Sequence, residues 1–235
     1  HHPQYYDDEV KLLLNHRAGL PAFGRLDRTR WQEIIKSYPM MKSATLYSDY
    51  SALRLMLLLE EKTGKRLAQL SKKHLDEEIV FWKDLPKKAM CPETGFRDRR
   101  VVQGQVHDNN AFIVEEFCSH AGLFGTIEGV CRTLLENNKK QLLFEKMQTE
   151  FALPHQRFVF GFDTVEDLEN TLAGQGASKN TFGHLGFTGT SFWIDLEKKK
   201  GHVLLTNATQ KYSYDKVKLN SLRRELGRLS WKMFL

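Results

Sequence analysis

Residues 182–191 read Phe-Gly-His-Leu-Gly-Phe-Thr-Gly-Thr-Ser, and the fold prediction starts from this stretch. It leads into an apolar run over residues 187–196, which predicts a strand. Another strand is predicted over residues 202–206, and the basic segment 198–201 between the two predicts a hairpin turn. Residues 157–163 predict a further strand upstream. The carboxy-terminal part of the chain therefore predicts an antiparallel sheet.

A helix is predicted from about Tyr214 to the end of the chain. Its apolar residues recur three or four positions apart and predict one buried face, made of Leu219, Leu222, Leu226, Leu229 and Met233. Strands that precede this helix and follow a mainly helical first part are typical of the α+β class. In that class helices cover an antiparallel sheet.

Three helices are predicted in the first part of the chain. The T-x-x-Q spacing at residues 29–32 is that of a capping box and predicts a helix over residues 31–37. A buried helix is predicted over residues 49–62, with Gly64 as its stop. A third begins at Thr126, and its apolar stripe predicts that Cys131 is a small buried side chain.

These elements predict three parts. Residues 1–21 form an entry segment, residues 22–150 a mainly helical subdomain, and residues 151–235 the sheet hairpin and terminal helix of the α/β part. Residues 65–110 are predicted to be irregular, because prolines and charge clusters interrupt every periodic pattern there.

The composition is that of a soluble globular protein, with 41% hydrophobic and 27% charged residues. The longest apolar run, residues 55–59, is too short to cross a bilayer. The net charge of +6 is spread along the chain, so no nucleic-acid partner is predicted. His1 and His2 resemble the end of a purification tag, and no secretory signal is predicted. The compartment stays open.

Three cysteines without C-x-x-C spacing predict neither a disulfide scaffold nor a zinc site, and no cofactor is predicted. His16, His107 and His120 lie in glycine-containing turns, where an imidazole can satisfy loop carbonyls, so they are predicted to be structural. Glu115 and Glu116 are adjacent, so their side chains point different ways and predict no acid–base pair.

Four segments occur in an order that is similar to serine β-lactamase-like, penicillin-binding hydrolases. Residues 12–21 (LLLNHRAGLP) resemble the L-L-x-H-x-S-G-L-P turn of that family, and Tyr47-Ser48-Asp49 resembles its Y-x-N element. Residues 104–111 and 120–124 resemble G-x-V-H-D-x-N-A and the H-A-G-L-F segment, and residues 182–191 resemble the H-T-G or K-T-G strand. The family includes class C β-lactamases, D,D-peptidases, esterases and inactive relatives.

The resemblance implies an S-x-x-K pair well before the H-x-x-G-L-P turn, where serine is the nucleophile and lysine shares its helical face. Only fifteen residues precede His16, and none is a serine. The one S-x-x-K, Ser213 to Lys216, lies past the last strand and is interpreted as coincidental. The sequence is therefore expected to lack the amino-terminal part of the domain. The missing strands would expose a sheet edge, which would allow a homo-oligomer.

The resemblance implies roles for two residues of the first part. Tyr47 would be the general base or proton relay, although a free phenol has a pKa of about 10 and needs nearby cations; the alternative is a tyrosine packed at a helix entrance. Asp49 stands where many relatives have asparagine and would touch the substrate. Aspartate is equally suited to cap the helix, and this interpretation is favoured.

In the sheet, the resemblance gives His184 the place of the strand lysine or histidine, where it would supply positive charge or a hydrogen bond. Leu185 replaces the usual hydroxyl residue, which argues against β-lactam recognition. Gly186 allows close backbone approach, and the amide of Phe187 would point into the oxyanion hole. The alternative is an ordinary strand.

Two functions follow from the resemblance. The first is a serine hydrolase that forms an acyl-enzyme on a peptide, ester or β-lactam carbonyl, with a small-molecule or peptidoglycan-derived substrate. The second is a non-catalytic relative that binds wall peptide or a partner protein, which Arg17, Leu185 and the absent S-x-x-K favour.

Overall fold

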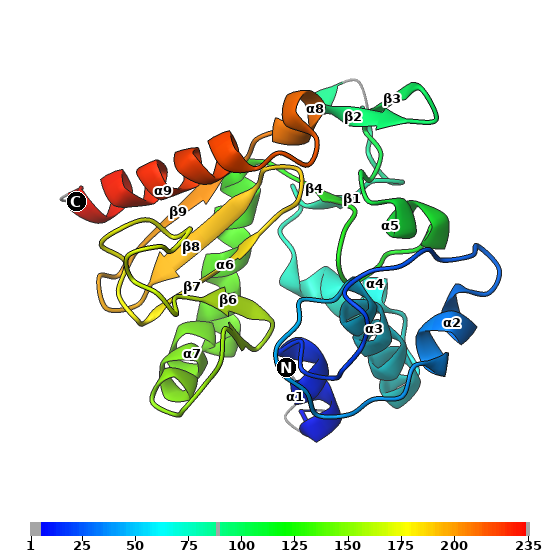
Figure 1. Ribbon diagram of the computed structural model, residues 1–235, viewed down its shortest axis with the longest axis horizontal. Helices are drawn as coiled ribbons and strands as arrows, with labels where there is room; N and C mark the ends of the chain where they lie inside the picture. Colours follow the sequence, from blue (N-terminus) through cyan, green and yellow to red (C-terminus); the bar gives the residue numbers. More distant parts are fainter. Residues whose placement is uncertain (1–5, 88–89, 234–235) are drawn as a thin grey trace. The chain divides into compact units, whose positions relative to one another are not determined.

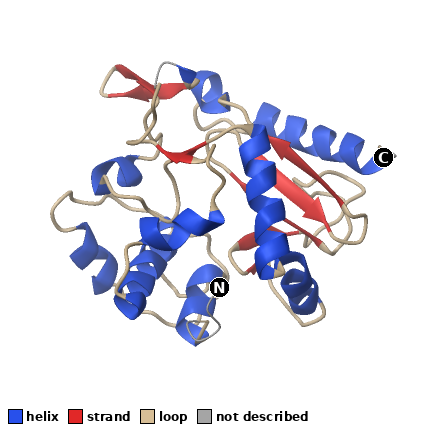
Figure 2. Ribbon diagram, turned by 180° about the vertical axis from the view of Figure 1, so that it is seen from behind, coloured by secondary structure: helices blue, strands red, loops and turns tan. Residues whose placement is uncertain are grey.

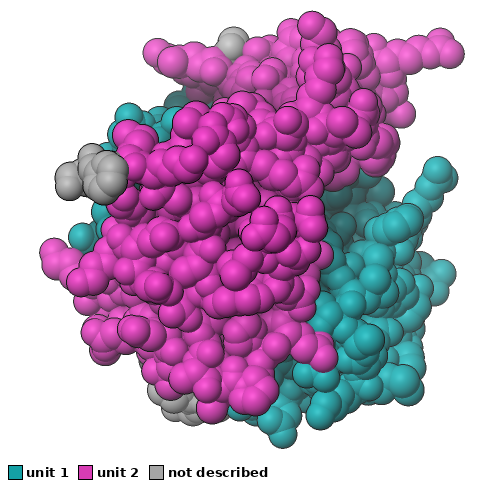
Figure 3. Space-filling view, turned by 60° about the vertical axis from the view of Figure 1, so that its left-hand side comes forward, with its two compact units in different colours: residues 1–86, 105–137 teal, residues 87–104, 138–235 magenta. Residues whose placement is uncertain are grey.

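The computed structural model describes residues 6–87 and 90–233, so the tag-like His1 and His2 lie outside the described residues. The chain forms two compact units (Figure 3). Unit 1 consists of residues 1–86 and 105–137, and unit 2 of residues 87–104 and 138–235. Each unit has hydrophobic clusters of its own. The predicted division at residues 21 and 150 stays a prediction.

Unit 1 is mainly helical (Figure 1). Its elements are α1 (Asp8–Leu14), α2 (Trp31–Ser37), α3 (Asp49–Thr63), α4 (Leu67–Ser71), the 3-10 helix η2 (Lys72–His74), β1 (Val80–Phe81), α5 (Asn109–Val114) and β4 (Leu123–Phe124), with α6 (Ile127–Gln141) running on into unit 2. Strands β1 and β4 pair with each other.

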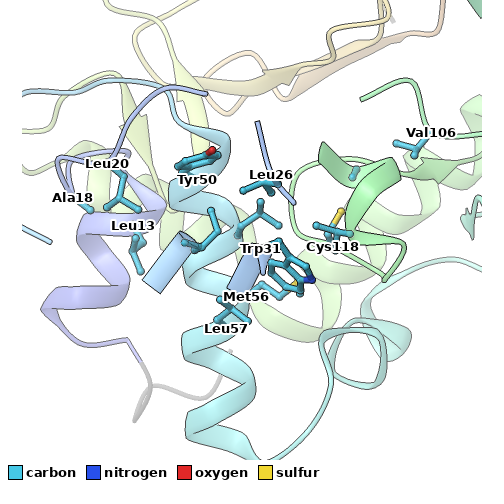
Figure 4. Packing of buried hydrophobic residues seen from close by; sticks show 14 of the residues in the cluster. Leu13, Ala18, Leu20, Leu26, Trp31, Tyr50, Met56, Leu57, Val106 and Cys118 are labelled. Carbon is cyan, nitrogen blue, oxygen red and sulfur yellow. The ribbon is translucent and has the colours of Figure 1, made fainter. Parts of the chain in front are cut away.

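The core of unit 1 surrounds α3, which presents Leu53, Met56 and Leu57 to it. Trp31 of α2 and Leu13 of α1 pack into the same cluster (Figure 4). Burying this many large apolar side chains is worth about 1.5–3 kcal/mol for each of them before the entropy cost is subtracted. The periodic apolar residues therefore predicted α3 correctly, and Gly64 ends it in the left-handed conformation, as expected.

The predicted cap of α2 and the predicted burial of Cys131 differ from what the structure shows. Helix α2 spans the predicted residues, but no capping box forms, because Thr29 donates its hydroxyl and its amide to Asp27. Helix α6 spans residues 127–141, yet Gly129 is its only buried residue among those that the structure describes. Cys131 is half-buried, so its predicted burial is wrong.

Unit 2 contains a five-stranded antiparallel sheet in the order β5-β6-β7-β8-β9. The strands are β5 (Phe158–Val159), β6 (Phe162–Thr164), β7 (Thr181–Leu185), β8 (Ser191–Asp195) and β9 (Lys200–Leu204). A separate hairpin pairs β2 (Glu93–Arg97) with β3 (Arg100–Gln103). The helices are α7 (Leu143–Phe151), α8 (Ala208–Tyr212) and α9 (Val217–Lys232). The α+β class and the β8–β9 hairpin are confirmed.

Helices cover both faces of this sheet (Figures 1 and 2). Met147 of α7 packs against Phe182 of β7 on one face. Trp231 of α9 packs with Trp193 of β8 on the other. Since successive strand residues point to opposite faces, a sheet with two covered faces needs apolar residues at consecutive positions. That requirement explains the run Phe192-Trp193-Ile194.

Two predictions for unit 2 are wrong in detail. Residues 157–163 form a tight hairpin of β5 and β6 and not one strand, because Phe160 and Gly161 turn the chain with φ of 51° and 85°. Residues 93–103, predicted to be irregular, form the β2–β3 hairpin.

The predicted buried face of the last helix is wrong in part, since Leu219 is buried and Leu226 half-buried. Leu222, Leu229 and Met233 are exposed, and the buried residues of α9 are Leu219, Arg223, Gly227 and Trp231. These four recur every fourth position and form a narrower stripe than the leucine pattern predicted. Its two unusual members, an arginine and a glycine, lie where α9 approaches backbone.

Candidate active site

In unit 1 the H-x-x-G-L-P turn holds the segment that contains Tyr47. The amide of Leu46 donates to the carbonyl of His16 at 2.9 Å, and the Ser48 hydroxyl donates to the Pro21 carbonyl at 2.6 Å. The amide of Ser48 donates to Nδ1 of His16 at 3.2 Å. Two segments that lie about thirty residues apart in the sequence are therefore tied together by backbone and side-chain hydrogen bonds.

Tyr47 rests against His16. The two ring centroids lie 4.6 Å apart at an interplanar angle of 42°. His16 is buried, and it adopts the left-handed conformation with φ 52° that brings its ring to this place. Tyr47 itself keeps 41% of its surface exposed. The phenol is thus held at a fixed position while part of it stays accessible, which is an arrangement suited to proton transfer.

The cap of α3 is Ser48, whose hydroxyl accepts from the amide of Ser51 at 2.9 Å. The expectation that Asp49 caps the helix is therefore wrong. Asp49 occupies the first turn, and burial raises the pKa of its carboxyl. The positive charge of His120 acts against this rise, and the negative charge of Asp108 adds to it.

Replacing Asp49 with asparagine is expected to stabilise the protein at pH 7 by about 1 kcal/mol, the usual size of a desolvation penalty. A carboxyl whose pKa is raised by folding binds its proton more tightly in the folded state, so ionisation at neutral pH costs stability. The gain should disappear below the unfolded pKa of about 4, where both states carry a neutral carboxyl. Urea unfolding of Asp49→Asn and the unchanged protein at pH 7 and pH 3 measures this.

The matched control is Asp8→Asn. Asp8 occupies the first position of α1 but is exposed. Removing the charge of Asp8 should remove only a favourable interaction with the helix dipole, so Asp8→Asn should destabilise the protein by about 0.5 kcal/mol. If both variants lose stability, burial does not dominate at Asp49.

Asp108 and His120 form a pair in unit 1 in which the histidine side chain is buried and the aspartate side chain is 33% exposed. Oδ1 of Asp108 lies 3.0 Å from Nε2 of His120, whose side chain is 3% exposed. Burial alone would lower the pKa of His120, but its hydrogen bond to Asp108, together with the neighbouring Cys118 sulfur, outweighs burial and raises that pKa to about 10. Burial would likewise raise the pKa of Asp108, but His120 and the amides of the first turn of α5 hold it below its usual value. The pair is therefore ionic at pH 7.

The same oxygen of Asp108 also caps α5 by accepting from the amide of Ala111 at 2.7 Å. Asn110 accepts from the amide of Leu26 and donates to the carbonyl of Gly24. The V-H-D-x-N-A segment therefore connects α5 to the chain that follows the H-x-x-G-L-P turn. These contacts fit the structural roles expected for His16 and His120, and His107 lies half-buried in the same turn.

Glu115 and Glu116 bind different partners. Glu115 pairs with Arg28 at 2.5 Å and with Lys83, whereas Glu116 pairs with Arg66. The two side chains thus point in different directions, as expected for neighbours in the chain.

In unit 2 the candidate residues lie at the end of β7. A side chain at Gly186 would overlap the Thr190 hydroxyl, and one at Gly183 would overlap the Phe192 carbonyl. Both positions require glycine because another strand or the following turn passes close by. Gly186 therefore allows a close contact within the turn at residues 186–190, which connects β7 to β8; the close approach to a substrate stays a prediction.

Burial lowers the pKa of His184, with the charge of Asp163 acting against this shift. The imidazole is therefore neutral at pH 7, which favours a hydrogen-bonding role over the positive charge that was also considered. Its Nδ1 lies 3.1 Å from the carbonyl of Leu185. Which ring nitrogen carries the proton follows from this contact, since a carbonyl only accepts.

Phe187 is half exposed at the tip of the turn at residues 186–190. Its ring contacts that of Tyr214, with centroids 5.4 Å apart, and Nζ of Lys216 lies 4.0 Å from the ring centroid. Lys216 and the buried Arg223 bind carbonyls of this turn, a role that sequence reasoning missed. The leucines of α9 predicted a different buried face, so the burial of Arg223 was missed. The only signal for it in the sequence is the four-residue spacing from Leu219 to Trp231.

Ser213 and Lys216 do not form the helical S-x-x-K pair. Ser213 follows α8 with φ 49°, and Lys216 is the residue before α9, so the two do not share a helical turn. Nζ of Lys216 donates to the carbonyl of Ser213 at 2.9 Å. This geometry agrees with the interpretation of the motif as coincidental.

Tyr47 and Asp49 belong to unit 1, and His184, Gly186 and Phe187 belong to unit 2. Within the described residues, no group of three or more His, Cys, Asp or Glu side chains is arranged to hold a metal ion. None of the helices formed by these residues has the length and apolar character needed to cross a membrane.

One curated relative is an N-acetylmuramyl-L-alanine amidase from Bacillus subtilis (strain 168). It is 25% identical over 249 residues, which cover 85% of this chain and 56% of that protein. The chain thus spans little more than half the length of this relative.

Three solved structures share the fold at 14% sequence identity. A β-lactamase from Mycobacterium bovis superposes with a TM-score of 0.57 over 94% of this chain and 72% of its own. The simvastatin synthase LovD from Aspergillus terreus gives a TM-score of 0.61 over 94% and 67%. FmtA from Staphylococcus aureus gives 0.61 over 97% and 66%.

The β-lactamase family model matches residues 9–224. This match includes all four segments that carry the resemblance, from the H-x-x-G-L-P turn to the strand at His184. The chain belongs to the β-lactamase family.

Proposed function

We propose that this chain is part of a serine hydrolase that forms an acyl-enzyme on a carbonyl substrate. The observation that carries the proposal is the placement of Tyr47. Its ring is held against His16 by a turn that also binds the Ser48 amide, while 41% of its surface stays exposed. A tyrosine needed only for packing would not require such anchoring of a partly exposed ring.

The proposed mechanism assigns one role each to Tyr47, His184, Gly186 and Phe187. A serine hydroxyl attacks the substrate carbonyl, and its proton passes through Tyr47 to the leaving amine or alcohol as the carbonyl–heteroatom bond breaks. The amide of Phe187 stabilises the oxyanion, with Gly186 allowing the close approach. His184, neutral at pH 7, hydrogen-bonds the substrate, and Asp49 lies near Tyr47 in the sequence and in unit 1.

The substrate class that we favour is an amide or peptide derived from peptidoglycan. The relative from Bacillus subtilis is named an N-acetylmuramyl-L-alanine amidase, which supports an amide carbonyl next to a muramyl group. Leu185 supplies no hydroxyl at the position where the family's strand motif has one, which argues against a β-lactam.

The nucleophile is the missing part of this mechanism. No serine precedes His16 in the printed residues, and the S-x-x-K at residues 213–216 has the wrong geometry. In the whole protein the attacking serine would then come from outside these residues. The alternative is a non-catalytic member of the family that binds wall peptide, which the absence of this pair also favours.

Labelling followed by intact-mass measurement tests the proposal. The protein translated with its upstream gene sequence should gain one adduct from a fluorophosphonate, on a serine before residue 1. The printed chain alone should gain none, and an adduct on it would contradict the proposed source of the nucleophile. No adduct on either protein would favour the non-catalytic alternative.

Tyr47→Phe should slow the labelling of the longer protein about 100-fold, the usual contribution of a general acid–base residue. Tyr38→Phe is the control, since it removes a phenol hydroxyl from another aromatic contact in unit 1. Equal rates in the two variants would remove Tyr47 from the mechanism.

A further inference from the structure

The turn at residues 186–190 has an unusual property: all five of its carbonyls accept a hydrogen bond. The carbonyls of Gly186 and Thr190 accept from amides within the turn at 3.1 and 2.8 Å. That of Thr188 accepts from the Thr209 amide, and that of Gly189 accepts from the Thr206 hydroxyl at 3.0 Å. The fifth, Phe187, accepts from Lys216 at 2.9 Å. A surface loop normally leaves such groups to water.

Arg223 supplies the central part of this network. Its Nη2 donates to the carbonyl of Gly186 at 2.9 Å and to that of Thr190 at 2.7 Å, so one guanidinium joins the two ends of the turn. Its Nη1 donates to Asn220 one turn earlier in α9. The residue is only 4% exposed.

The charge of Arg223 is not neutralised by a carboxylate. None of the ion pairs formed by residues 6–87 and 90–233 includes it, and its buried Nε has no hydrogen-bond acceptor among these residues. Burying an unpaired guanidinium is costly, and a leucine would suit the apolar face of α9 better. The cost indicates that the position serves the turn and not only the core.

Because the peptide bond is planar, the contact between Arg223 and the Gly186 carbonyl also determines where the next N–H group points. In a trans peptide the carbonyl of one residue and the N–H of the next point in opposite directions, and the described residues contain no cis bond. Because Arg223 binds the Gly186 carbonyl, the N–H of Phe187 points away from the guanidinium. In the same way, the bond from Lys216 to the Phe187 carbonyl directs the Thr188 N–H away from Lys216.

We propose that Arg223 and Lys216 are positioning residues that aim the Phe187 amide out of the turn at residues 186–190, toward the oxyanion of the substrate. The direction of the amide follows from the hydrogen bonds alone, whereas its use by an oxyanion rests on the proposed function. Both residues also place positive charge behind the amide, where it favours developing negative charge. Neither residue touches the substrate in this proposal.

Hydrogen exchange of the backbone amides, measured by NMR on the chain as printed, tests the positioning role without any activity. In Arg223→Met, the amides of Gly186 and Gly189, which close the turn, should exchange at least tenfold faster. Amides in the middle of β7 and β8 should keep their rates. Unchanged exchange at Gly186 and Gly189 would overturn the inference.

Arg228→Met is the matched control, because Arg228 lies on the same helix but bonds only to Glu225 among the contacts described. Arg223→Lys covers the case in which the methionine variant does not fold. A single ammonium can reach one of the two carbonyls but lacks the planar fork of a guanidinium, so partial protection is expected. Lys216→Met, with Lys218→Met as its control, tests the second cation in the same way.

Labelling of the longer protein then links the turn to catalysis. Arg223→Lys should lower the rate of serine phosphonylation at saturating fluorophosphonate about tenfold and change the half-saturating concentration little, since a donor to the transition-state oxyanion is affected. A change confined to the half-saturating concentration would contradict the link to the oxyanion. If the unsubstituted longer protein is not labelled at all, the proposed function fails, while the exchange data still decide the positioning role.

Discussion

Alanine in place of Gly227 should lower the free energy of unfolding by about 3 kcal/mol, the upper part of the usual range for overpacking. A Cβ at this position of α9 would overlap the carbonyl oxygen of Ala173 and lie 2.9 Å from the Cα of Gly174. All of these atoms are backbone, so no side chain can rotate away. Helix propensity alone predicts the opposite, a gain of about 1 kcal/mol for glycine to alanine in a helix. Urea unfolding monitored by tryptophan fluorescence measures whether the free energy of unfolding falls or rises.

Ser221→Ala is the control for this variant. Ser221 lies on the exposed side of the same helix, so its replacement should stabilise α9 by at most about 0.5 kcal/mol. A Gly227→Ala protein that is as stable as the unsubstituted one would mean that α9 does not approach the loop at residues 173–174 so closely.

Gly227 also explains why the buried face of α9 was predicted wrongly. Hydrophobicity marks residues such as Leu222 and Leu229 as core, yet both are 48% exposed. What determines the face is a close contact with backbone, which only a residue without a side chain permits, and a carbonyl-lined turn that an arginine can bind. Neither requirement is visible in an apolar periodicity, because both depend on segments far away in the sequence.

Local signals predicted the helices better than their caps. Gly64 ends α3 because a left-handed residue there costs glycine nothing. The caps were missed, because several residues nearby could each accept the same amides. Asp27 accepts from the hydroxyl and the amide of Thr29, so this hydroxyl does not cap α2. Ser48 accepts from the Ser51 amide, a donor that Asp49 could also have reached.

The missed hairpins have turns without the usual residues. Asp98 and Arg99 both take positive φ, 50° and 64°, in the β2–β3 turn. An Asn-Gly pair at these positions would have predicted the hairpin from the sequence. Phe160 does the same in the β5–β6 turn. The order of the family segments gave Tyr47 and His184 as candidates, but it contained no information on Lys216 and Arg223, which lie outside those segments.

Breaking the Asp108–His120 pair of unit 1 should have the largest effect. Asp108→Asn is expected to lower the free energy of unfolding at pH 7 by about 3 kcal/mol, because His120 loses the partner that keeps it protonated and the buried imidazole then becomes neutral. Asparagine can still accept from the Ala111 amide, so most of the cap of α5 should remain. The loss therefore reports mainly on the charge. Urea unfolding of both proteins at several pH values measures it.

The contribution of His120 to the free energy of unfolding should decrease as the pH rises. Folding raises the pKa of His120 from 6.5 to about 10, so this group stabilises the fold fully below pH 6.5. Between pH 6.5 and 10 the folded state holds a proton that the unfolded state has released. Stability should therefore fall with rising pH in this window, at most about 1.4 kcal/mol per unit for one proton. Above pH 10 the contribution is lost.

Asp108→Asn should lack this dependence, so the difference between the two proteins should be fully present at pH 6.5, fall as the pH rises, and be small above pH 10. Other groups that titrate in alkali affect both proteins alike and cancel in the difference. Glu33→Gln, which removes an exposed ion pair with Arg30, should cost less than about 1 kcal/mol at every pH. A difference that stays constant from pH 6.5 to pH 10 would show that Asp108 acts through its cap alone and that His120 is not held as a cation.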